Sequence, residues 1–350
     1  MAPTAVTRED TVWLGASEPK PGIRVECSAW GASWLRCEVR LPDGSLRQVL
    51  LPPSYPQVGP HQPRSYMGST LGRYANRIAH GRFSQKHQTW ALKREPGQPH
   101  QLHGGPHGWD TRRWEQTSLT GSSVAYTLES PDGDQGYPGH ASVQTQYQLL
   151  DDWSLELSWR VTVDQSCPVC VSNHAYFNLD PRNEQGGCTD VRQHTLQLNA
   201  QRFAPVDVGL IPLGPLAPTA HTSFDFRTPR KLLTHWLQDE QQRHGAGYDH
   251  AFLLDKPSLD QPAAWLGSAD GRLTLSLFST QPALQLYAGQ YLAGLPAPNG
   301  QTYLACQGLA LEPQWLPDSP NHPEWPQPTV WLEPGQAWEH RAIYRFHTTD

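Results

Sequence analysis

The sequence predicts an all-β protein, a large and mostly antiparallel β-sandwich with few short helices. Three observations support this fold class: alternation of apolar and polar residues, frequent turn signals, and very little helical periodicity. The alternation is clearest in Ser154–Val163, where every second residue from Leu155 to Val163 is apolar and the residues between them are polar. A period of two is typical of a strand with one buried face.

Other segments show the same alternation, and we expect strands at Val124–Leu128, Val143–Tyr147, Thr195–Leu198, Arg272–Phe278 and Arg341–Phe346. Turn signals rich in Pro, Asp, Asn and Gly separate the predicted strands, at 42–44, 131–133, 270–271, 298–300 and 334–335. Only the segment from Pro229 to Arg243 has helical periodicity, with Leu232, Leu233, Trp236 and Leu237 on one face. This combination of elements favours a sandwich.

We expect residues 1–350 to form a single domain, because large β folds often exceed the usual domain length. The 33 prolines are spread along the chain and mark no linker. The net charge is −6 and basic residues form no run, which argues against a nucleic-acid partner. No stretch approaches the roughly 20 apolar residues of a membrane span, and no apolar segment opens the chain, so the expected location is the cytoplasm. Six irregularly spaced cysteines, including Cys167 and Cys170, are expected to be reduced.

Three residues suggest proton-transfer chemistry. His103 precedes Gly104 and Gly105, which let backbone approach a ligand closely, whereas His174 and Glu312 lie in two other segments. If the fold brings them together, a histidine that donates a proton and a glutamate that accepts one need neither metal nor cofactor. From the residues alone, a hydrogen-bonded core histidine is the favoured interpretation of His174.

Further candidates are suited to binding hydroxyl groups. Arg73, Asn76 and Arg77 offer planar donors and an amide, although a solvent-facing strand edge explains them as well. Asp249 follows a glycine-rich turn and could accept hydrogen bonds from a sugar, or could cap the turn. Fourteen tryptophans and twelve tyrosines could stack on sugars or fill the core.

A metal site is not predicted. The spacing of His100, His103 and His107 does not match the usual zinc patterns. The loop beginning at Asp132 lacks the glycine and the glutamate that a calcium loop requires at its sixth and twelfth positions.

Several motifs occur in order along the chain: Gly72–Ala79 (GRYANRIA), Leu102–Gly105 (LHGG), Gly108–Asp110 (GWD), Asn173–Leu179 (NHAYFNL), Phe224–Arg227 (FDFR), Tyr248–Phe252 (YDHAF) and Leu311–Gln314 (LEPQ), followed by Pro317–Pro323 (PDSPNHP). Together they strongly resemble aldose 1-epimerase, the galactose mutarotase family, and especially its bacterial members. The resemblance extends from about Trp30 to Phe346, and the first thirty residues match weakly. It implies a galactose mutarotase-like supersandwich and an isomerase without a cofactor.

The resemblance also implies roles for individual residues. His174 matches the general acid that acts at the ring oxygen, and Glu312 the general base that acts at the C1 hydroxyl. Asn76, Arg77, His103 and Asp249 match or adjoin the family's sugar-binding positions and are the substrate-binding residues that the resemblance implies. The expected substrates are free aldohexoses such as D-galactose and D-glucose.

The sequence also gives expectations for the shape of the pocket and for the protonation of the acid–base pair. Pro313, Trp109 and Trp315 depart from the residues common in the family, and we expect the two tryptophans to reshape the mouth of the pocket. Ordinary pKa values, about 4.3 for Glu and about 6.5 for His, predict an ionised Glu312 beside a partly protonated His174, with Asp249 raising the protonated fraction. The alternatives are a hexose-6-phosphate 1-epimerase and a non-catalytic carbohydrate-binding protein.

Overall fold

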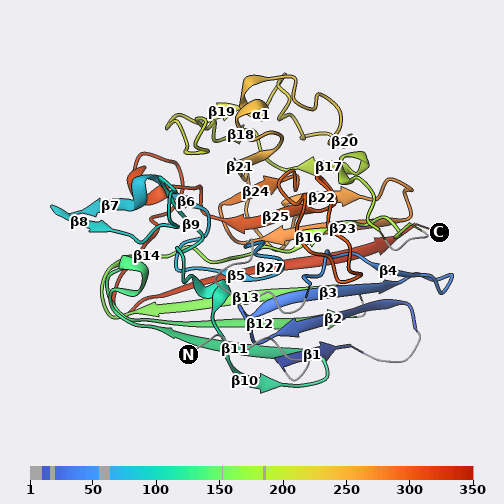
Figure 1. Ribbon diagram of the computed structural model, residues 1–350, viewed down its shortest axis with the longest axis horizontal. Helices are drawn as coiled ribbons and strands as arrows, with labels where there is room; N and C mark the ends of the chain where they lie inside the picture. Colours follow the sequence, from blue (N-terminus) through green and yellow to red (C-terminus); the bar gives the residue numbers. More distant parts are fainter. Residues whose placement is uncertain (1–9, 16–19, 55–63, 152, 184–186, 350) are drawn as a thin grey trace.

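The computed structural model describes residues 10–15, 20–54, 64–151, 153–183 and 187–349. Its largest sheet has nine strands, all paired antiparallel (Figure 1). In spatial order they are β10 (Glu115–Leu119), β11 (Ser123–Ser130), β12 (Ala141–Asp151), β13 (Ser154–Val163), β27 (Ala337–Thr348), β23 (Leu273–Ser279), β22 (Ala264–Gly267), β17 (Thr195–Leu198) and β20 (Arg230–Lys231).

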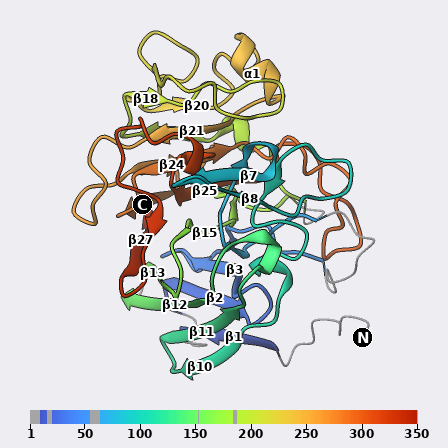
Figure 2. The ribbon, with the colours of Figure 1, turned by 90° about the vertical axis from the view of Figure 1, so that its left-hand side faces the viewer.

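A six-stranded sheet lies over the part of the nine-stranded sheet that includes β27 and β23 (Figures 1 and 2). Its spatial order is β16 (Tyr176–Phe177), β25 (Leu309–Gln314), β24 (Ala283–Tyr287), β21 (Asp249–Leu253), β18 (Arg202–Phe203) and β19 (Ala217–Pro218). A four-stranded sheet contains β1 (Thr11–Leu14), β2 (Gly22–Ser28), β3 (Ser33–Arg40) and β4 (Leu46–Gln48).

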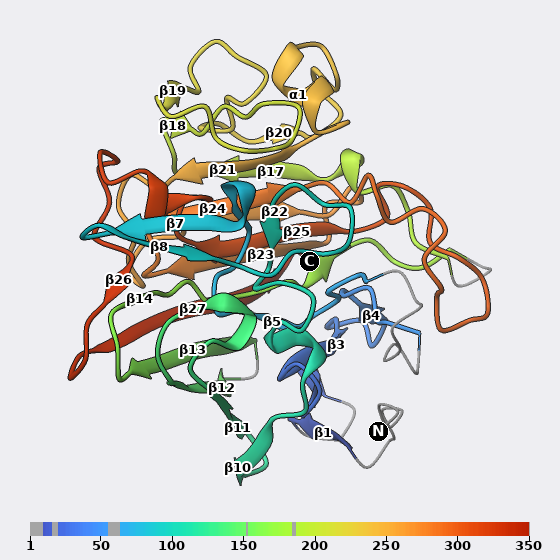
Figure 3. The ribbon, with the colours of Figure 1, turned by 60° about the vertical axis from the view of Figure 1, so that its left-hand side comes forward.

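Short strand pairs and single helical turns connect the sheets (Figure 3). The pairs are β5 (Thr70–Leu71) with β15 (Ser172–Asn173), β6 (Arg77–Ile78) with β9 (Gln101–Leu102), β7 (Arg82–Gln85) with β8 (Gln88–Ala91), and β14 (Cys167–Pro168) with β26 (Trp331–Leu332). The helices are α1 (Glu240–His244) and the 3₁₀ turns η2 (Ala79–Gly81), η3 (Trp109–Thr111), η4 (Asp134–Gly136), η5 (Val191–Gln193) and η6 (Ser319–Asn321).

The core lies where the three sheets meet. Trp34 of β3 packs edge-on against Phe177 of β16 and Tyr344 of β27, with ring centroids 5.8 and 5.1 Å apart. Phe177 and Tyr344 also stack on each other. One aromatic ring from each sheet therefore contributes to the same contact, which fixes the sheets relative to one another. Tryptophan here fills the core, one of the two roles considered for it.

The predicted all-β fold class is confirmed, and the strand predictions locate real strands. The segment Ser154–Val163 is β13 without any change in its ends, and Leu155, Leu157, Trp159, Val161 and Val163 are buried. The predicted turns also form. In each of them the glycine has a positive φ, which other residues rarely adopt; these glycines are Gly44, Gly133, Gly271, Gly300 and Gly335.

The predicted helix between Pro229 and Arg243 is wrong. Arg230–Lys231 instead pairs with β17, and the amide of Leu232 continues this contact by donating to the carbonyl of His194. His235 and Leu237 have positive φ angles, which end any helical path. A helix forms only at Glu240–His244, where the Asp239 side chain accepts from the Gln242 amide. Pairing at the edge of the sheet thus prevails over the local periodicity.

All six cysteines lie in the described residues, and all are free thiols. Burial raises the pKa of Cys170 to about 12 and raises that of Cys167 as well, the opposite of a reactive thiol. Across the described ranges, no helix has the length and apolar character needed to span a bilayer.

Candidate active site

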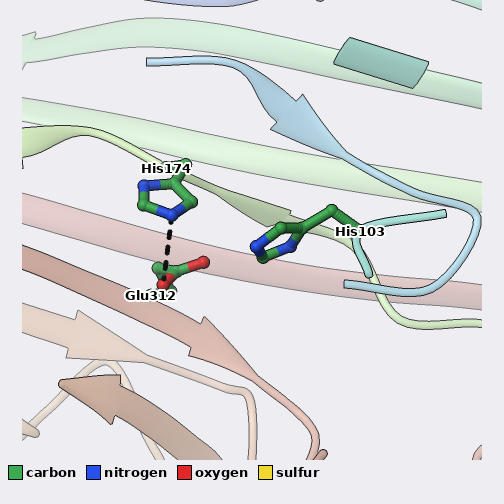
Figure 4. A group of neighbouring side chains, drawn as sticks. All are labelled: His103, His174 and Glu312. Atoms are coloured by element: carbon green, nitrogen blue, oxygen red, sulfur yellow. Dashed lines mark ion pairs between the residues drawn. The ribbon is translucent and has the colours of Figure 1, made fainter. Parts of the chain in front are cut away.

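His174 and Glu312 face each other in the interior (Figure 4). The Nε2 atom of His174 lies 3.7 Å from Oε1 of Glu312, and the two residues are 4 % and 1 % exposed. His174 directly follows β15, where its amide donates to the Ser69 carbonyl and its own carbonyl accepts from the Gly68 amide. Glu312 lies in the middle of β25. Hydrogen-bonded strands therefore hold both members of the pair.

The register of the six-stranded sheet gathers polar and aromatic side chains on the face that carries Glu312. Gln285 is the cross-strand partner of Glu312, and Tyr287 is the partner of both Asp249 and Ala310. Because cross-strand partners point to the same face of a sheet, Asp249, Gln285 and Glu312 project together. A hydrogen bond of 2.5 Å from Nε2 of Gln285 to Oδ1 of Asp249 links the row.

His103 reaches the pair from a separate loop, which follows β9 (Figure 4). One nitrogen or oxygen from each of His103, His174 and Glu312 lies within 4.8 Å of the others. The backbone amide of Asn76 donates to Nδ1 of His103 over 3.1 Å, and the His103 amide donates to the Asn76 carbonyl over 3.0 Å. Since Nδ1 accepts, a neutral His103 carries its proton on Nε2 and offers a donor.

Gly104 makes this placement of His103 possible. Its φ is +84°, and a Cβ atom at this position would lie 1.9 Å from the Gly72 carbonyl oxygen. The glycine is therefore required by close backbone approach, as the sequence suggested, but the approaching group is the protein's own chain.

Arg77 and Asp249 form the more accessible side of the site. Nη2 of Arg77 lies 3.7 Å from Oδ2 of Asp249, and their side chains are 19 % and 10 % exposed. The Asn76 side chain turns back to accept from the Arg77 amide at 2.8 Å. Arg73 does not join them, contrary to the sequence prediction, because its buried guanidinium donates to the carbonyls of Pro138 and Gly139.

Aromatic rings surround the imidazoles. Tyr66 packs against His103 and stacks on His174, with centroids 4.6 and 5.9 Å apart. Tyr176 and Tyr287 contact His174 from other directions, at 4.7 and 6.2 Å. These rings shield His174 from water.

Burial shifts the proton affinities of the pair toward uncharged forms. Burial lowers the pKa of His174 to about 4, and it raises the pKa of Glu312 well above its ordinary value, with a further increase from the charge of Asp249. Burial therefore opposes the expected ionised Glu312 and partly protonated His174. Asp249 acts on Glu312, whereas we expected it to act on His174.

A metal ion fits this cluster poorly. His103 would have to bind through Nε2, which carries a proton as long as Nδ1 accepts from the Asn76 amide. A cavity of about 790 Å³ lies elsewhere and is lined by Arg36, Arg182, Tyr303 and the loop 297–304. None of the predicted site residues lines it.

The expected effect of the two tryptophans on the pocket mouth finds no support. Trp109 and Trp315 are 1 % and 3 % exposed and belong to the hydrophobic core. The sequence did not identify four further residues of the site, namely Gln285, Tyr66, Tyr176 and Tyr287. Gln285 carried a signal, because it is the polar residue in the otherwise apolar strand Ala283–Tyr287, whose five residues are all buried.

A large antiparallel β fold that buries a histidine–glutamate pair near an arginine–aspartate pair is consistent with an enzyme acting on carbohydrates. The family model "Aldose 1-epimerase" matches residues 18–345. The chain is 44% identical over 326 residues to the aldose 1-epimerase of Escherichia coli K12, covering 93% of this chain and 92% of that protein. It is 36% identical over 328 residues to the galactose mutarotase of Mus musculus, covering 93% and 91%.

Solved structures agree with these similarities. An aldose epimerase homologue from C. elegans superposes with a TM-score of 0.86 at 25% identity, covering 99% of this chain and 100% of that one. A galactose 1-epimerase from Lactobacillus acidophilus gives 0.79 at 25% identity, covering 97% and 99%. The chain belongs to the aldose 1-epimerase family, a family of isomerases, and the predicted family, fold and enzyme class are confirmed.

Proposed function

We propose that this chain interconverts the α and β anomers of free aldohexoses such as D-galactose and D-glucose, with Glu312 as general base and His174 as general acid. The observation that carries the assignment is their buried approach of 3.7 Å. In addition, Oε2 of Glu312 and Nδ1 of His174 are buried without a hydrogen-bond partner among the described residues. Buried polar atoms normally have partners, so unpaired ones beside a reactive pair favour a ligand there.

The proton inventory supports the reaction. Glu312 takes the proton of the C1 hydroxyl while His174 gives a proton to the ring oxygen, the C1–O5 bond breaks, and C1 becomes an aldehyde. Rotation about C1–C2 presents the other carbonyl face, and the reverse transfers close the ring to the other anomer. Each cycle returns both side chains to their starting forms and consumes nothing.

Burial assists the opening step. The pair has two states with the same number of protons. In the charged state Glu312 is a carboxylate and His174 an imidazolium; in the uncharged state the proton has moved from His174 to Glu312. Ring opening converts the charged pair into the uncharged pair, and the uncharged pair is the one that burial favours. Hydrogen bonds from sugar hydroxyls to the carboxylate would stabilise the charged state needed at the start.

Sugar binding is assigned to Arg77, His103 and Asp249, with Asn76 holding the first two in place. Arg77 and the Nε2 proton of His103 supply donors, and Asp249 supplies an acceptor. The charges favour an unphosphorylated sugar. Arg77 is already paired with Asp249, and Arg64 is paired with Asp110 and Glu95, so a phosphate dianion would meet carboxylates.

Polarimetry on freshly dissolved sugars tests this proposal. We expect accelerated mutarotation of α-D-galactose or α-D-glucose and much weaker acceleration for glucose 6-phosphate. Preference for the phosphate ester would instead indicate a hexose-6-phosphate epimerase. Sugar binding without any acceleration would indicate a non-catalytic carbohydrate-binding protein.

A further inference from the structure

The segment Pro317–Pro323 has no part in the chemistry proposed above, yet its first polar residue is deeply buried. Asp318 is 2 % exposed and has a φ of +61°, a conformation that few residues other than glycine adopt without cost. It immediately precedes η6 and lies four residues after Gln314, the last residue of β25. The strand that carries Glu312 therefore leads directly into this segment.

Asp318 holds one edge of the chain at the short strand β6. Its backbone amide donates to the Arg77 carbonyl over 2.8 Å, and its Oδ1 accepts from the Ala79 amide at 2.9 Å. These hydrogen bonds fix the position of the backbone at β6, which begins with the proposed sugar-binding residue Arg77. On its other edge, β6 pairs with β9, where Arg77 is the partner of Leu102, the residue before His103.

Neighbouring side chains keep the Asp318 carboxylate in place. Nδ2 of Asn321 donates to Oδ1 of Asp318 over 2.6 Å and to the Arg82 carbonyl over 2.9 Å. Nε2 of His322 lies 3.5 Å from Oδ2 of Asp318, and the His322 ring stacks on Trp325. Burial lowers the pKa of His322, but its contacts with Asp318 and Glu324 outweigh burial and raise it, which favours a charged partner for Asp318.

We infer that Asp318 is a positioning residue, which sets the place of Arg77 relative to Glu312 by joining the end of β25 to the backbone of β6. This inference rests on the proposed function, because it concerns how the sugar is held for the acid–base pair. A displaced Arg77 would bind the sugar less well in its ground state and in its transition state alike. Loss of the Asp318 side chain should therefore raise KM and change kcat little.

Asp318→Ala and Asp318→Asn, assayed by polarimetry with galactose, test this inference. Alanine leaves the Ala79 amide without its acceptor, and we expect KM to rise about tenfold with kcat within about twofold. Asparagine keeps an acceptor oxygen, and we expect it to restore KM to within about threefold of the wild type. The galactose Kd from calorimetry should follow KM in each variant.

Asp180→Ala is the matched control. Asp180 is also buried, at 7 % exposure, and its Oδ1 accepts from the Ala269 amide at 2.7 Å, a contact outside the proposed site. Its loss should lower the melting temperature but leave KM unchanged. If Asp180→Ala raises KM as much as Asp318→Ala does, the effect is general loosening and the positioning role is refuted.

The remaining outcomes are also decisive. An unchanged KM and Kd in folded Asp318→Ala would overturn the inference, as would a failure of asparagine to restore them. If Asp318→Ala does not fold, Asn321→Ala decides: this exposed residue supports Asp318, and its loss should raise KM about threefold, while no rise would overturn the inference. A wild-type protein that binds galactose without accelerating mutarotation would contradict the proposed function, and the Kd series would still test Asp318.

Discussion

Replacing Glu312 with glutamine should separate catalysis from stability. Glutamine has nearly the same shape, so the strand β25 and the contact with His174 are kept. It cannot take the proton of the C1 hydroxyl, and loss of a positioned general base typically costs about 10²–10⁴-fold in rate. We therefore expect kcat to fall by a factor in this range, with a smaller change in KM.

Whereas the activity of Glu312→Gln should fall, its free energy of unfolding should increase relative to that of the wild type as pH rises. The folded-state pKa of Glu312 is raised, mainly by burial and then by Asp249, so the folded state keeps this proton at a pH where the unfolded state has lost it. Its contribution to stability is thus fully present below the unfolded pKa and decreases as pH rises toward the folded pKa. For one group the slope is about 1.4 kcal/mol per pH unit. The glutamine variant lacks this loss and should gain stability relative to wild type as pH rises.

Two assays on the same samples check both halves. Polarimetry with α-D-galactose measures the rate, and urea denaturation at several pH values measures the free energy of unfolding. Full activity in Glu312→Gln would remove Glu312 from the mechanism. A variant whose stability relative to wild type falls with rising pH would show that Glu312 is not held in the environment described here.

Three further changes have defined outcomes. Burial lowers the His174 pKa to about 4, so between that pH and about 6.5 the unfolded state binds more protons than the folded state, and the free energy of unfolding falls as pH falls. In His174→Asn this fall, measured by urea denaturation, should be shallower, and mutarotation should be lost. Asp249→Asn removes the ion pair with Arg77 and one of the two acceptor oxygens, and it should raise KM for galactose about tenfold or more in polarimetric titrations; an unchanged KM would remove Asp249 from the sugar site. Gly104→Ala should lower the melting temperature and raise KM, because its Cβ would lie 1.9 Å from backbone. Gly44→Ala is the control: it has the same φ of +84° but no atom within 4 Å, so it should lower the melting temperature only slightly and leave KM unchanged.

Local patterns in the sequence were sufficient to predict six strands of the nine-stranded sheet but none of the four- and six-stranded sheets; the six are β11, β12, β13, β17, β23 and β27. In β13 the apolar residues face the core and every second residue is buried, so alternation in the sequence and burial in the structure have the same origin. The segment after Pro229 shows the limit of such patterns. Its helical periodicity is real, but its backbone pairs with β17, a partner more than 30 residues away in the chain that no local pattern reveals.

The candidate site divides in the same manner. His103, His174 and Glu312 were identified from their motifs, and the fold brings them within 4.8 Å of one another. The ordinary pKa values used for His174 and Glu312 do not hold in the folded protein, because they ignore burial. For His174, part of this burial comes from Tyr66 and Tyr176, whose positions are known only from the three-dimensional structure.

Residues outside the obvious motifs depend on register. Gln285 enters the site because β24 pairs with β25 so that it stands beside Glu312, and a slip of one residue would turn it to the opposite face. Arg73 failed as a sugar-binding candidate because its guanidinium finds backbone carbonyls in the interior. A motif therefore indicates which residues matter more reliably than it indicates what each contacts.

A crystal structure of Glu312→Gln with D-galactose would test the central assignment most directly, because the slow variant should hold intact sugar. The assignment predicts the C1 hydroxyl within about 3.2 Å of the side chain at position 312 and the ring oxygen at a similar distance from His174. Galactose bound with neither oxygen near these two side chains, or seated in the separate 790 Å³ cavity, would contradict it.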